Sequence, residues 1–375
     1  MKYYIQDRPA QGDNARTAFS KARSDAESIC AGEGWRPLSV WSEGADYADA
    51  GLWRKLRGHF SRRRDWAEAL APLGAGDLLF LQLPILYNCV FLPGVLRRAR
   101  RRGVRVIALV HDLEVLRMCL EENVSRKTRL RMRLEETGAL GQCDRLIVHN
   151  DPMAALLAEQ GLPRERMIPL GIFDYLMPDQ TERAVEERPP SADRALAVAG
   201  NLSPDKAGYI YHTPPEVILD LYGVKYAGGD LPHRYHGSFP PDELPARLET
   251  GFGLVWDGPS AETCEGVYGA YLRYNDPHKT SLYLASGLPV VIWEKAALAE
   301  LIRRENAGLT AASVAEGARM AAQLPTAAYS VMRDNAASLG KRLRKGAFLR
   351  AALTAAEASP AHRPGNKSVI AKKRS

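Results

Sequence analysis

The chain has 375 residues, of which 46% are hydrophobic and 25% are charged, and its formal net charge is +7. This length and composition suit two ordinary globular domains, each with its own core. No apolar run approaches the roughly 20 residues of a membrane span, and the N-terminal residues lack the apolar centre of a signal peptide, so a cytoplasmic protein is expected.

The cysteines and arginines narrow the expected chemistry further. Five scattered cysteines form neither a CxxC motif nor a Cys/His cluster at zinc spacing, which favours reduced, structural thiols. The positive charge is concentrated in three arginine-rich segments, at 54–64, 97–105 and 126–133. Such segments suit an anionic membrane surface, a phosphorylated lipid or a nucleic acid, and they equally suit solvated helix faces.

Strand and helix patterns alternate through the first half of the chain. The expected strands are 3–5, 38–41, 77–82, 104–110 and 145–149, and the expected helices are 15–31, 53–70, 90–101 and a further one opened by Asn150-Asp151-Pro152. This order predicts a parallel sheet covered on both sides by helices.

A polar, proline-bearing stretch at 178–194 is predicted to be a linker or an exposed loop, and a second alternating series follows it. Its expected strands are 196–199, 235–239, 252–257 and 288–293, with a helix-to-strand region at 217–222 and helices at 242–249, 276–286, 297–305 and 331–356. We therefore predict four parts: a domain at 1–170, a second domain at 171–325, a closing helix at 326–357 that braces the first domain, and a basic disordered tail at 358–375.

The stretch from Tyr271 to Trp293 carries the clearest chemical signal. Asp276 and Pro277 suit a helix start, and His278 and Lys279 then fall in the first turn, where free backbone N–H groups favour an anion. A cation in that turn opposes the helix dipole unless an anion lies in front of it. After Gly287, the apolar run 288–293 is typical of a buried parallel strand. Together these features predict half of an α/β nucleotide site.

The motif PxKxxxYLAxGxPVV, starting at Pro277, accompanies six further stretches in order along the chain. They are SKARSDAESI (20–29), HDLEVLR (111–117), LGIFDYL (170–176), GNLSPDKAGYIY (200–211), GSFPPDELP (237–245) and FGLVWDG (252–258). In these stretches the chain resembles the bacterial GT-B glycosyltransferase family of β-1,6-galactofuranosyltransferases and of glucosyltransferases that extend GlcNAc on serine-rich adhesins.

The resemblance implies an α/β fold of the GT-B type, with two doubly wound Rossmann-like domains facing an interdomain cleft. It implies transfer of galactofuranose or glucose from a UDP-sugar to a glycan, glycolipid or glycoprotein acceptor, without a metal or other cofactor. The first domain would bind the acceptor and the second the UDP-sugar. The sequence itself shows no strand-terminal DxD and no carboxylate pair with His at ligand spacing, so fixed cations and helix N-termini are expected to stabilise the departing diphosphate.

The expected donor residues follow strand ends of the second domain or begin its central helix. Lys279 and His278 are the first choice for the diphosphate, and Gly200, Asn201 and Lys206 form a second phosphate site. The remaining donor residues are Tyr209, Tyr211, Asp257, Gly258 and Asn275. Each also has a structural interpretation, as a solvated lysine, a local cap, a turn residue or a core tyrosine.

Acceptor activation needs a base from the first domain. Asp112 is the preferred base, beside His111, with Glu114 as an acceptor-binding residue; a helix N-cap is the structural alternative for Asp112. Asp13 is a competing base, and Arg16 and Lys21 are expected to bind the acceptor or the diphosphate. Since no nucleophile is evident, we predict inverting transfer.

Two other functions remain open at this point. The arginine clusters fit a nucleic-acid-binding protein, but the aromatic interleaving of a single-strand binder is missing, so no nucleic acid is expected. A non-catalytic UDP-sugar-binding partner of another transferase fits the same motifs. We also expect a homo-oligomer, and peripheral contact of the basic segments with an anionic inner-membrane face.

Overall fold

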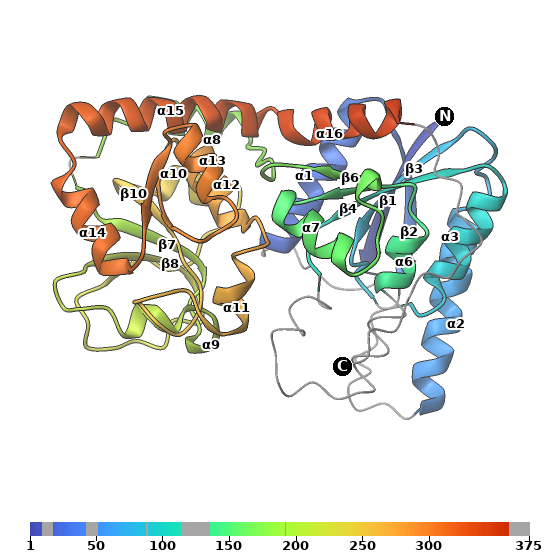
Figure 1. Cartoon of the computed structure of the whole chain (residues 1–375), viewed down its shortest axis with the longest axis horizontal. Coiled ribbons are helices and arrows are strands. Elements are labelled where there is room, and N and C mark those ends of the chain that lie inside the picture. The colour runs from blue at the N-terminus through green and yellow to red at the C-terminus, as the bar shows by residue number, and fades with distance from the viewer. Residues whose placement is uncertain (10–17, 43–51, 88, 114–135, 192, 360–375) are drawn as a thin grey trace. The chain divides into compact units, whose positions relative to one another are not determined.

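The computed structural model describes residues 1–9, 18–42, 52–87, 89–113, 136–191 and 193–359. The chain divides into two compact units, each built around one six-stranded parallel sheet (Figure 1). The first unit comprises 1–15, 26–170 and 350–375, and the second comprises 16–25 and 171–349. The unit changes after Leu170, and the first residues of helices α1 and α16 count with the second unit.

The sheet of the first unit has the strand order β2-β1-β3-β4-β5-β6. Its strands are β1 (Lys2–Pro9), β2 (Arg36–Ser42), β3 (Leu78–Leu83), β4 (Arg105–Val110), β5 (Arg145–Val148) and β6 (Met167–Pro169). All neighbouring strands are parallel. Every residue of β3 is buried, as expected of a strand covered on both faces.

The helices of this unit lie between its successive strands in the sequence, except α16, which follows the second unit. They are α1 (Ala18–Gly32), α2 (Leu52–Ala69), α3 (Leu92–Arg101), α6 (Gly138–Gly141), α7 (Asp151–Glu159), the 3-10 turn η2 (Arg164–Arg166) and α16 (Ala347–Ala358). The predicted cap of α7 is confirmed, because the Asn150 side chain accepts from the Met153 amide at 2.9 Å. The guanidinium of Arg105 donates to the Ala356 carbonyl at 3.1 Å, which holds the end of α16 in this unit.

The sheet of the second unit has the order β12-β11-β10-β7-β8-β9 and is also parallel. Its strands are β7 (Leu196–Asn201), β8 (Leu219–Val224), β9 (Arg234–Tyr235), β10 (Phe252–Val255), β11 (Val290–Trp293) and β12 (Gly308–Ala311). Its helices are α8 (Asp179–Glu187), α9 (Pro204–Ala207), η3 (Gly208–Tyr211), α10 (Leu244–Arg247), α11 (Gly266–Tyr271), α12 (His278–Ala285), α13 (Ala299–Arg304), α14 (Val314–Gln323) and α15 (Thr326–Arg344).

The expected linker at 178–194 is wrong in part, because it contains helix α8. Only Val185 of α8 is buried, so the sequence shows no apolar periodicity. Distant ion pairs hold the helix instead: Arg344 binds Glu182 at 2.7 Å and Glu186 at 2.8 Å. Tertiary contacts of this kind are invisible in a local pattern.

Other expected elements are shorter or interrupted. The closing segment is two helices, α15 and α16, because Gly346 adopts a left-handed conformation with φ of 68°. Of the expected strand at 235–239 only Tyr235 lies in a strand, the two-residue β9, and the helix at 242–249 is reduced to the four residues of α10. In the region at 217–222, residues 219–222 belong to strand β8 and none of the region is helical.

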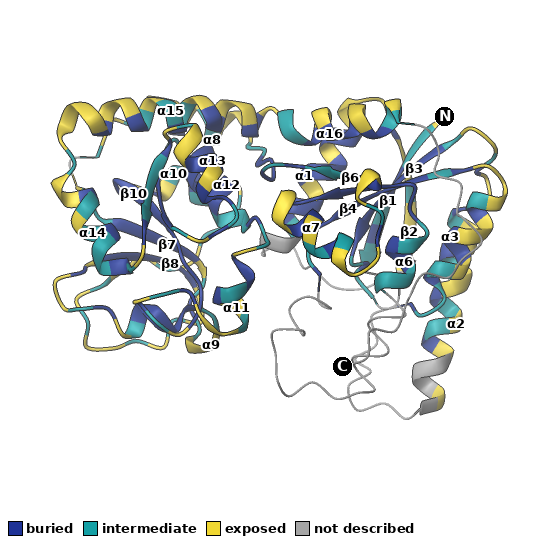
Figure 2. Cartoon of the chain, in the orientation of Figure 1, coloured by how far each residue is buried: buried dark blue, intermediate teal, exposed yellow. Residues whose placement is uncertain are grey.

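The central strands of both sheets are buried, while exposed residues lie on the edge strands β2 and β9 and on the outward faces of helices such as α3 and α15 (Figure 2). In α12 six of the eight residues are buried. No described helix is both long and apolar enough to cross a bilayer. The arginine segment at 126–133 and the tail at 360–375 lie outside the described residues.

Candidate active site

The strand order of the second sheet identifies where a ligand can bind. From β7 the chain moves to β8 and β9 on one side and then crosses to β10 on the other. Ligands of open parallel sheets bind outside the carboxyl ends of the strands at such a switch point. Gly200-Asn201 end β7 and Asp257-Gly258 follow β10, so both predicted pairs lie at this edge.

Lys279 is held at the same edge by two hydrogen bonds. Its ammonium donates to the Trp256 carbonyl and to Asp257 Oδ1, both at 2.8 Å. The two side chains are 14% and 8% exposed, so the pair is largely shielded from water. An ammonium has three N–H donors, and one is left without a partner among the described residues. Lys279 can therefore donate to a ligand oxygen from a fixed position.

Helix α12 is fixed against the sheet by Tyr283. A Cβ added to Gly253 of β10 would lie 2.1 Å from this ring, and the Ala199 amide of β7 donates to the Tyr283 hydroxyl at 2.8 Å. On its other side, a Cβ at Gly340 of α15 would lie 2.2 Å from the Leu284 carbonyl. Glycines at these positions permit the close packing that aims the first turn of α12 at the strand ends.

Gly258 connects the loop that carries a second lysine, Lys206, to this edge of the sheet. Its amide donates to the Lys206 carbonyl at 2.9 Å, and its carbonyl accepts from the Tyr209 amide at 3.1 Å. With φ of 110° and a Cβ position only 2.4 Å from the Glu265 carbonyl, only glycine fits here. Lys206 has no ion pair among the described residues, and its ammonium lies 5.6 Å from the Tyr268 ring centre. The structure thus brings Lys206, Asp257, Gly258 and Lys279 together.

At the carboxyl end of β4, His111 and Asp112 follow the last strand residue. His111 Nε2 lies 2.6 Å from Gln82 Oε1, and the His111 amide donates to the Leu83 carbonyl at 2.8 Å. Asp112 Oδ1 accepts from the Leu113 amide at 3.0 Å. These contacts fix the backbone direction at a position where a carboxylate can act as a base.

His149, at the end of β5, was not predicted from the sequence. It is 1% exposed, and burial lowers its pKa to about 4, against the opposing effect of the nearby Asp112 charge. The lower pKa follows because the neutral form of an imidazole costs less to bury than the charged form. The only signal in the sequence was its place after a strand, which it shares with many core residues.

Two family models cover most of the chain. The Glucosyltransferase 3-like N-terminal domain matches residues 2–172, and the Glucosyltransferase 3-like C-terminal domain matches residues 196–356. The β-1,6-galactofuranosyltransferase WbbI of Escherichia coli (strain K12) is 34% identical over 250 residues, which are 66% of this chain and 69% of that protein. The chain belongs to the Glucosyltransferase 3-like family.

Glucosyltransferase 3 of Streptococcus parasanguinis is 22% identical over 94% of this chain and 97% of its own. Among solved structures, trehalose-6-phosphate from Escherichia coli bound with UDP-2-fluoro glucose covers 96% of this chain and 100% of its own, with a TM-score of 0.57 and 11% identity. That likeness shows the fold. The Glucosyltransferase 3-like chain is therefore a glycosyltransferase of the GT-B fold, as its sequence predicted.

In this Glucosyltransferase 3-like chain His278, which the sequence predicted as a diphosphate residue, is engaged in contacts with the chain itself. Its ring stacks on Tyr175 with centroids 5.0 Å apart, and its Nε2 lies 3.3 Å from the Asp174 carbonyl. Burial, reinforced by the Lys21 charge, lowers its pKa to about 4. The neutral imidazole of His278 anchors the loop before α8, which favours the structural interpretation of this residue over diphosphate binding.

Lys21 is likewise placed in a structural network. Its ammonium donates to Asp25 Oδ1 at 2.8 Å and to the Leu176 carbonyl at 2.7 Å, and it pairs with Asp242 at 2.8 Å. All three donors are used, so this lysine has none left for an acceptor or a diphosphate. Asp13, Arg16 and Glu114, the other residues expected on the acceptor side, lie outside the described residues.

The two predicted tyrosines differ. Tyr209 is fully buried in the core, so its ring has no face open for a base, and the core interpretation of this residue is the correct one. Tyr211 is half-buried; its hydroxyl donates to the Leu202 carbonyl at 2.6 Å, and its ring stacks on Tyr226 at 5.9 Å. Near it, Asn201 Oδ1 accepts from the Ser203 amide at 3.0 Å.

Asn275 stands just before α12. Its side-chain oxygen is buried and has no hydrogen-bond partner among the described residues, and the same holds for the hydroxyl of Thr280. Buried polar atoms of this kind are uncommon and call for a partner. Thr280, which the sequence did not single out, therefore joins Asn275 as a residue that a bound ligand could satisfy. Among the described residues no group of His, Cys, Asp and Glu could hold a metal ion.

Proposed function

We propose that this glycosyltransferase moves a hexose from a UDP-sugar to a glycan, glycolipid or glycoprotein acceptor. The observation that carries the proposal is the Lys279–Asp257 pair beside Gly258 and Lys206, at the switch point of the second sheet. Such an edge suits a nucleotide diphosphate. A solved structure of the same fold contains UDP-2-fluoro glucose, which supports a UDP-sugar as the donor.

In this proposal the two lysines stabilise the leaving diphosphate. The remaining donor of Lys279 and the unpaired ammonium of Lys206 approach the phosphate oxygens, while the first-turn amides of α12 point the same way. Charge that develops on the leaving group is stabilised most by donors already held in position. Because fixed cations can serve this purpose, we propose transfer without a metal.

We propose Asp112 as the base that deprotonates the acceptor hydroxyl. The carboxylate lies at the carboxyl end of β4, and the buried, neutral His149 is near it. Direct displacement with one base inverts the anomeric centre. Residues 1–170 would then bind the acceptor, and residues 171–325 would bind the donor. An α-linked product from a UDP-α-sugar would contradict the inverting route.

The donor sugar is galactofuranose or glucose. The higher identity to the galactofuranosyltransferase, 34% against 22% for the streptococcal glucosyltransferase, favours galactofuranose. The test is a UDP-release screen over UDP-galactofuranose, UDP-glucose and UDP-galactopyranose with a panel of acceptors, followed by NMR of the product linkage. UDP release with none of the UDP-sugars would contradict the proposal.

We also propose that α2 contacts an anionic membrane. Trp53 and Phe60 are 84% and 54% exposed, and the exposed Arg57 and Arg64 share their helical stripe at a spacing of three or four residues. Exposed aromatic rings beside arginines suit the lipid headgroup region. The test is flotation with vesicles of anionic lipid: binding lost at high salt and in Trp53→Ser supports it, and equal flotation with neutral vesicles contradicts it. The homo-oligomer expected from the sequence stays a prediction, which light scattering can test.

A further inference from the structure

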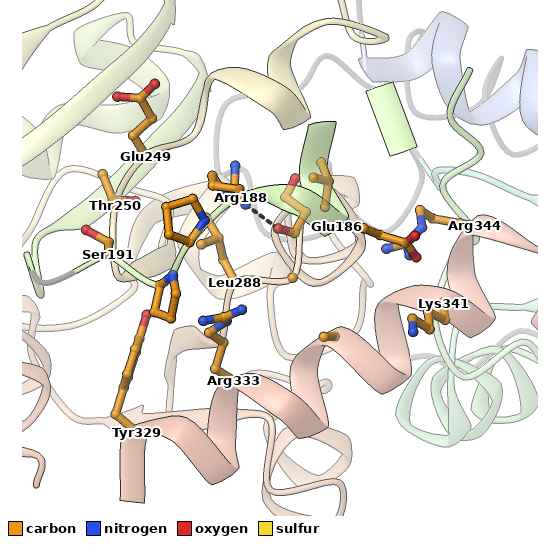
Figure 3. A pocket seen from close by; sticks show the side chains of 16 residues that line it. Glu186, Arg188, Ser191, Glu249, Thr250, Leu288, Tyr329, Arg333, Lys341 and Arg344 are labelled. Carbon is orange, nitrogen blue, oxygen red and sulfur yellow. Dashed lines mark hydrogen bonds and ion pairs between the residues drawn. The ribbon is translucent and has the colours of Figure 1, made fainter. Parts of the chain in front are cut away.

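A cavity of about 460 Å³ lies in the second unit, away from the strand ends described above (Figure 3). Its walls come from residues 188–191, 249–250 and 286–288, which precede β7, β10 and β11 respectively, and from α15. It therefore lies at the amino ends of the strands, whereas Lys279 and Asp257 lie at the carboxyl ends. The volume is within the range of small-molecule sites.

The cationic side chains that line this cavity differ in whether they form ion pairs. Arg344 is satisfied by Glu182 and Glu186 and by the Ala285 carbonyl at 2.8 Å. In contrast, Arg188, Arg333 and Lys341 have no ion pair among the described residues. Glu249 is the one remaining lining carboxylate outside that network, so the cavity carries an excess of positive charge.

Arg188 lies in a setting that suits an anion. Its guanidinium donates to the Pro245 carbonyl at 3.0 Å and to the Ser286 carbonyl. Its pKa is lowered, first by burial and then by the neighbouring Arg333 charge, while the charge of Glu249 opposes the shift. Figure 3 shows Arg333 extending from α15 toward Leu288 and Arg188. The two guanidinium groups repel each other, and a bound phosphate could pair with both of them.

The rest of the wall offers contacts for a polar ring. Pro189, Pro190 and Leu288 present apolar surface, while Ser191 and Glu249 present oxygen atoms. Tyr329 closes one side, and its hydroxyl already donates a hydrogen bond to the Gly251 carbonyl at 2.9 Å. A sugar ring combines an apolar face with hydroxyl donors, which matches this mixture of apolar and acceptor groups.

We infer that this cavity binds a hexose phosphate, with the phosphate at Arg188 and Arg333 and the sugar hydroxyls at Ser191 and Glu249. Lys341 adds to the positive charge that attracts the ligand. The inference does not rest on the proposed donor function, because none of these residues belongs to the Lys279 edge.

The test is calorimetric titration of the full chain with glucose 1-phosphate, inorganic phosphate and glucose. We expect glucose 1-phosphate to bind most tightly, inorganic phosphate more weakly and glucose not at all. The double substitution Arg333→Ala/Lys341→Ala should weaken binding about tenfold or more, since it removes charge-assisted contacts. Arg319→Ala, an exposed arginine of α14 outside the cavity, is the matched control and should bind as the wild type does.

Lys279→Ala distinguishes binding in the cavity, at the amino ends of the strands, from binding at their carboxyl ends. If glucose 1-phosphate still binds to it with unchanged affinity, the ligand lies at the cavity even if the donor proposal fails. Loss of binding in Lys279→Ala with retention in Arg333→Ala/Lys341→Ala would overturn the inference, as would no binding by the wild type. Circular dichroism melting confirms that each variant is folded. Arg188 is left unchanged because it also caps the end of α12.

Discussion

The carboxyl edges of the two sheets differ in the charge they present. The edge of the second sheet holds two ammonium groups, Lys279 and Lys206, of which one is fixed by Asp257 and one has no ion pair among the described residues. The edge of the first sheet has the carboxylate Asp112 beside His111 and the buried, neutral His149. Positive groups suit a departing diphosphate and a carboxylate suits a base, and on this ground we propose that each sheet serves one half of the reaction.

The largest expected effect tests the first sheet. Asp112→Asn keeps the shape of the side chain but removes its basicity, so kcat should fall by about 10² to 10⁴-fold with little change in donor affinity. Steady-state UDP release measures this effect. Asp151→Asn, an exposed carboxylate in α7, is the control and should retain activity. A wild-type kcat in Asp112→Asn would move the base to Asp13.

Lys21→Met tests whether a lysine with all its donors used is structural. It breaks a buried network with Asp25 and Asp242, and removing one partner of a buried pair costs about 3 kcal/mol or more. The loss is moderated because burial has already raised the pKa of Asp25 to about 6, so this carboxyl can protonate. Urea unfolding measures the loss, and a selective rise in donor KM with unchanged stability would contradict the structural role.

Gly258→Ala tests the loop that joins Lys206 to the edge. The added Cβ would lie 2.4 Å from the Glu265 carbonyl in a left-handed backbone conformation, so we expect a loss of roughly 2 kcal/mol in stability and weaker donor binding. The control is Gly94→Ala in α3, where a Cβ meets nothing within 4 Å and a helix gains up to about 1 kcal/mol. Equal stability of the two variants would show that the Gly258 loop tolerates a side chain.

The smallest effect concerns pH. The pKa of His149 is about 4 in the folded chain, below its ordinary value of 6.5, so the unfolded chain binds the extra proton between these values. Stability from this group is complete above pH 6.5 and is lost as pH falls toward 4. His149→Gln should flatten this part of the urea-unfolding profile. The same slope in the variant would assign the effect to another group.

Much of the fold was predictable because buried parallel strands read as apolar runs, as in β3 and β11. Helix α8 was not, because its stability comes from Arg344 far along the chain. The candidate site shows the same division. Lys279, Asp257 and Gly258 could be singled out as candidates from their places at strand and helix ends, whereas the contacts of His278 and Lys21 depend on burial and on partners that no local pattern contains.

The most direct test of the account is the affinity of UDP for the wild type and for Lys279→Ala, measured by calorimetry with Arg319→Ala as the control. If Lys279 donates to the diphosphate, Lys279→Ala should bind UDP at least about tenfold more weakly, while Arg319→Ala should bind it as the wild type does. Equal affinity of Lys279→Ala and the wild type would contradict the assignment of the diphosphate to this edge.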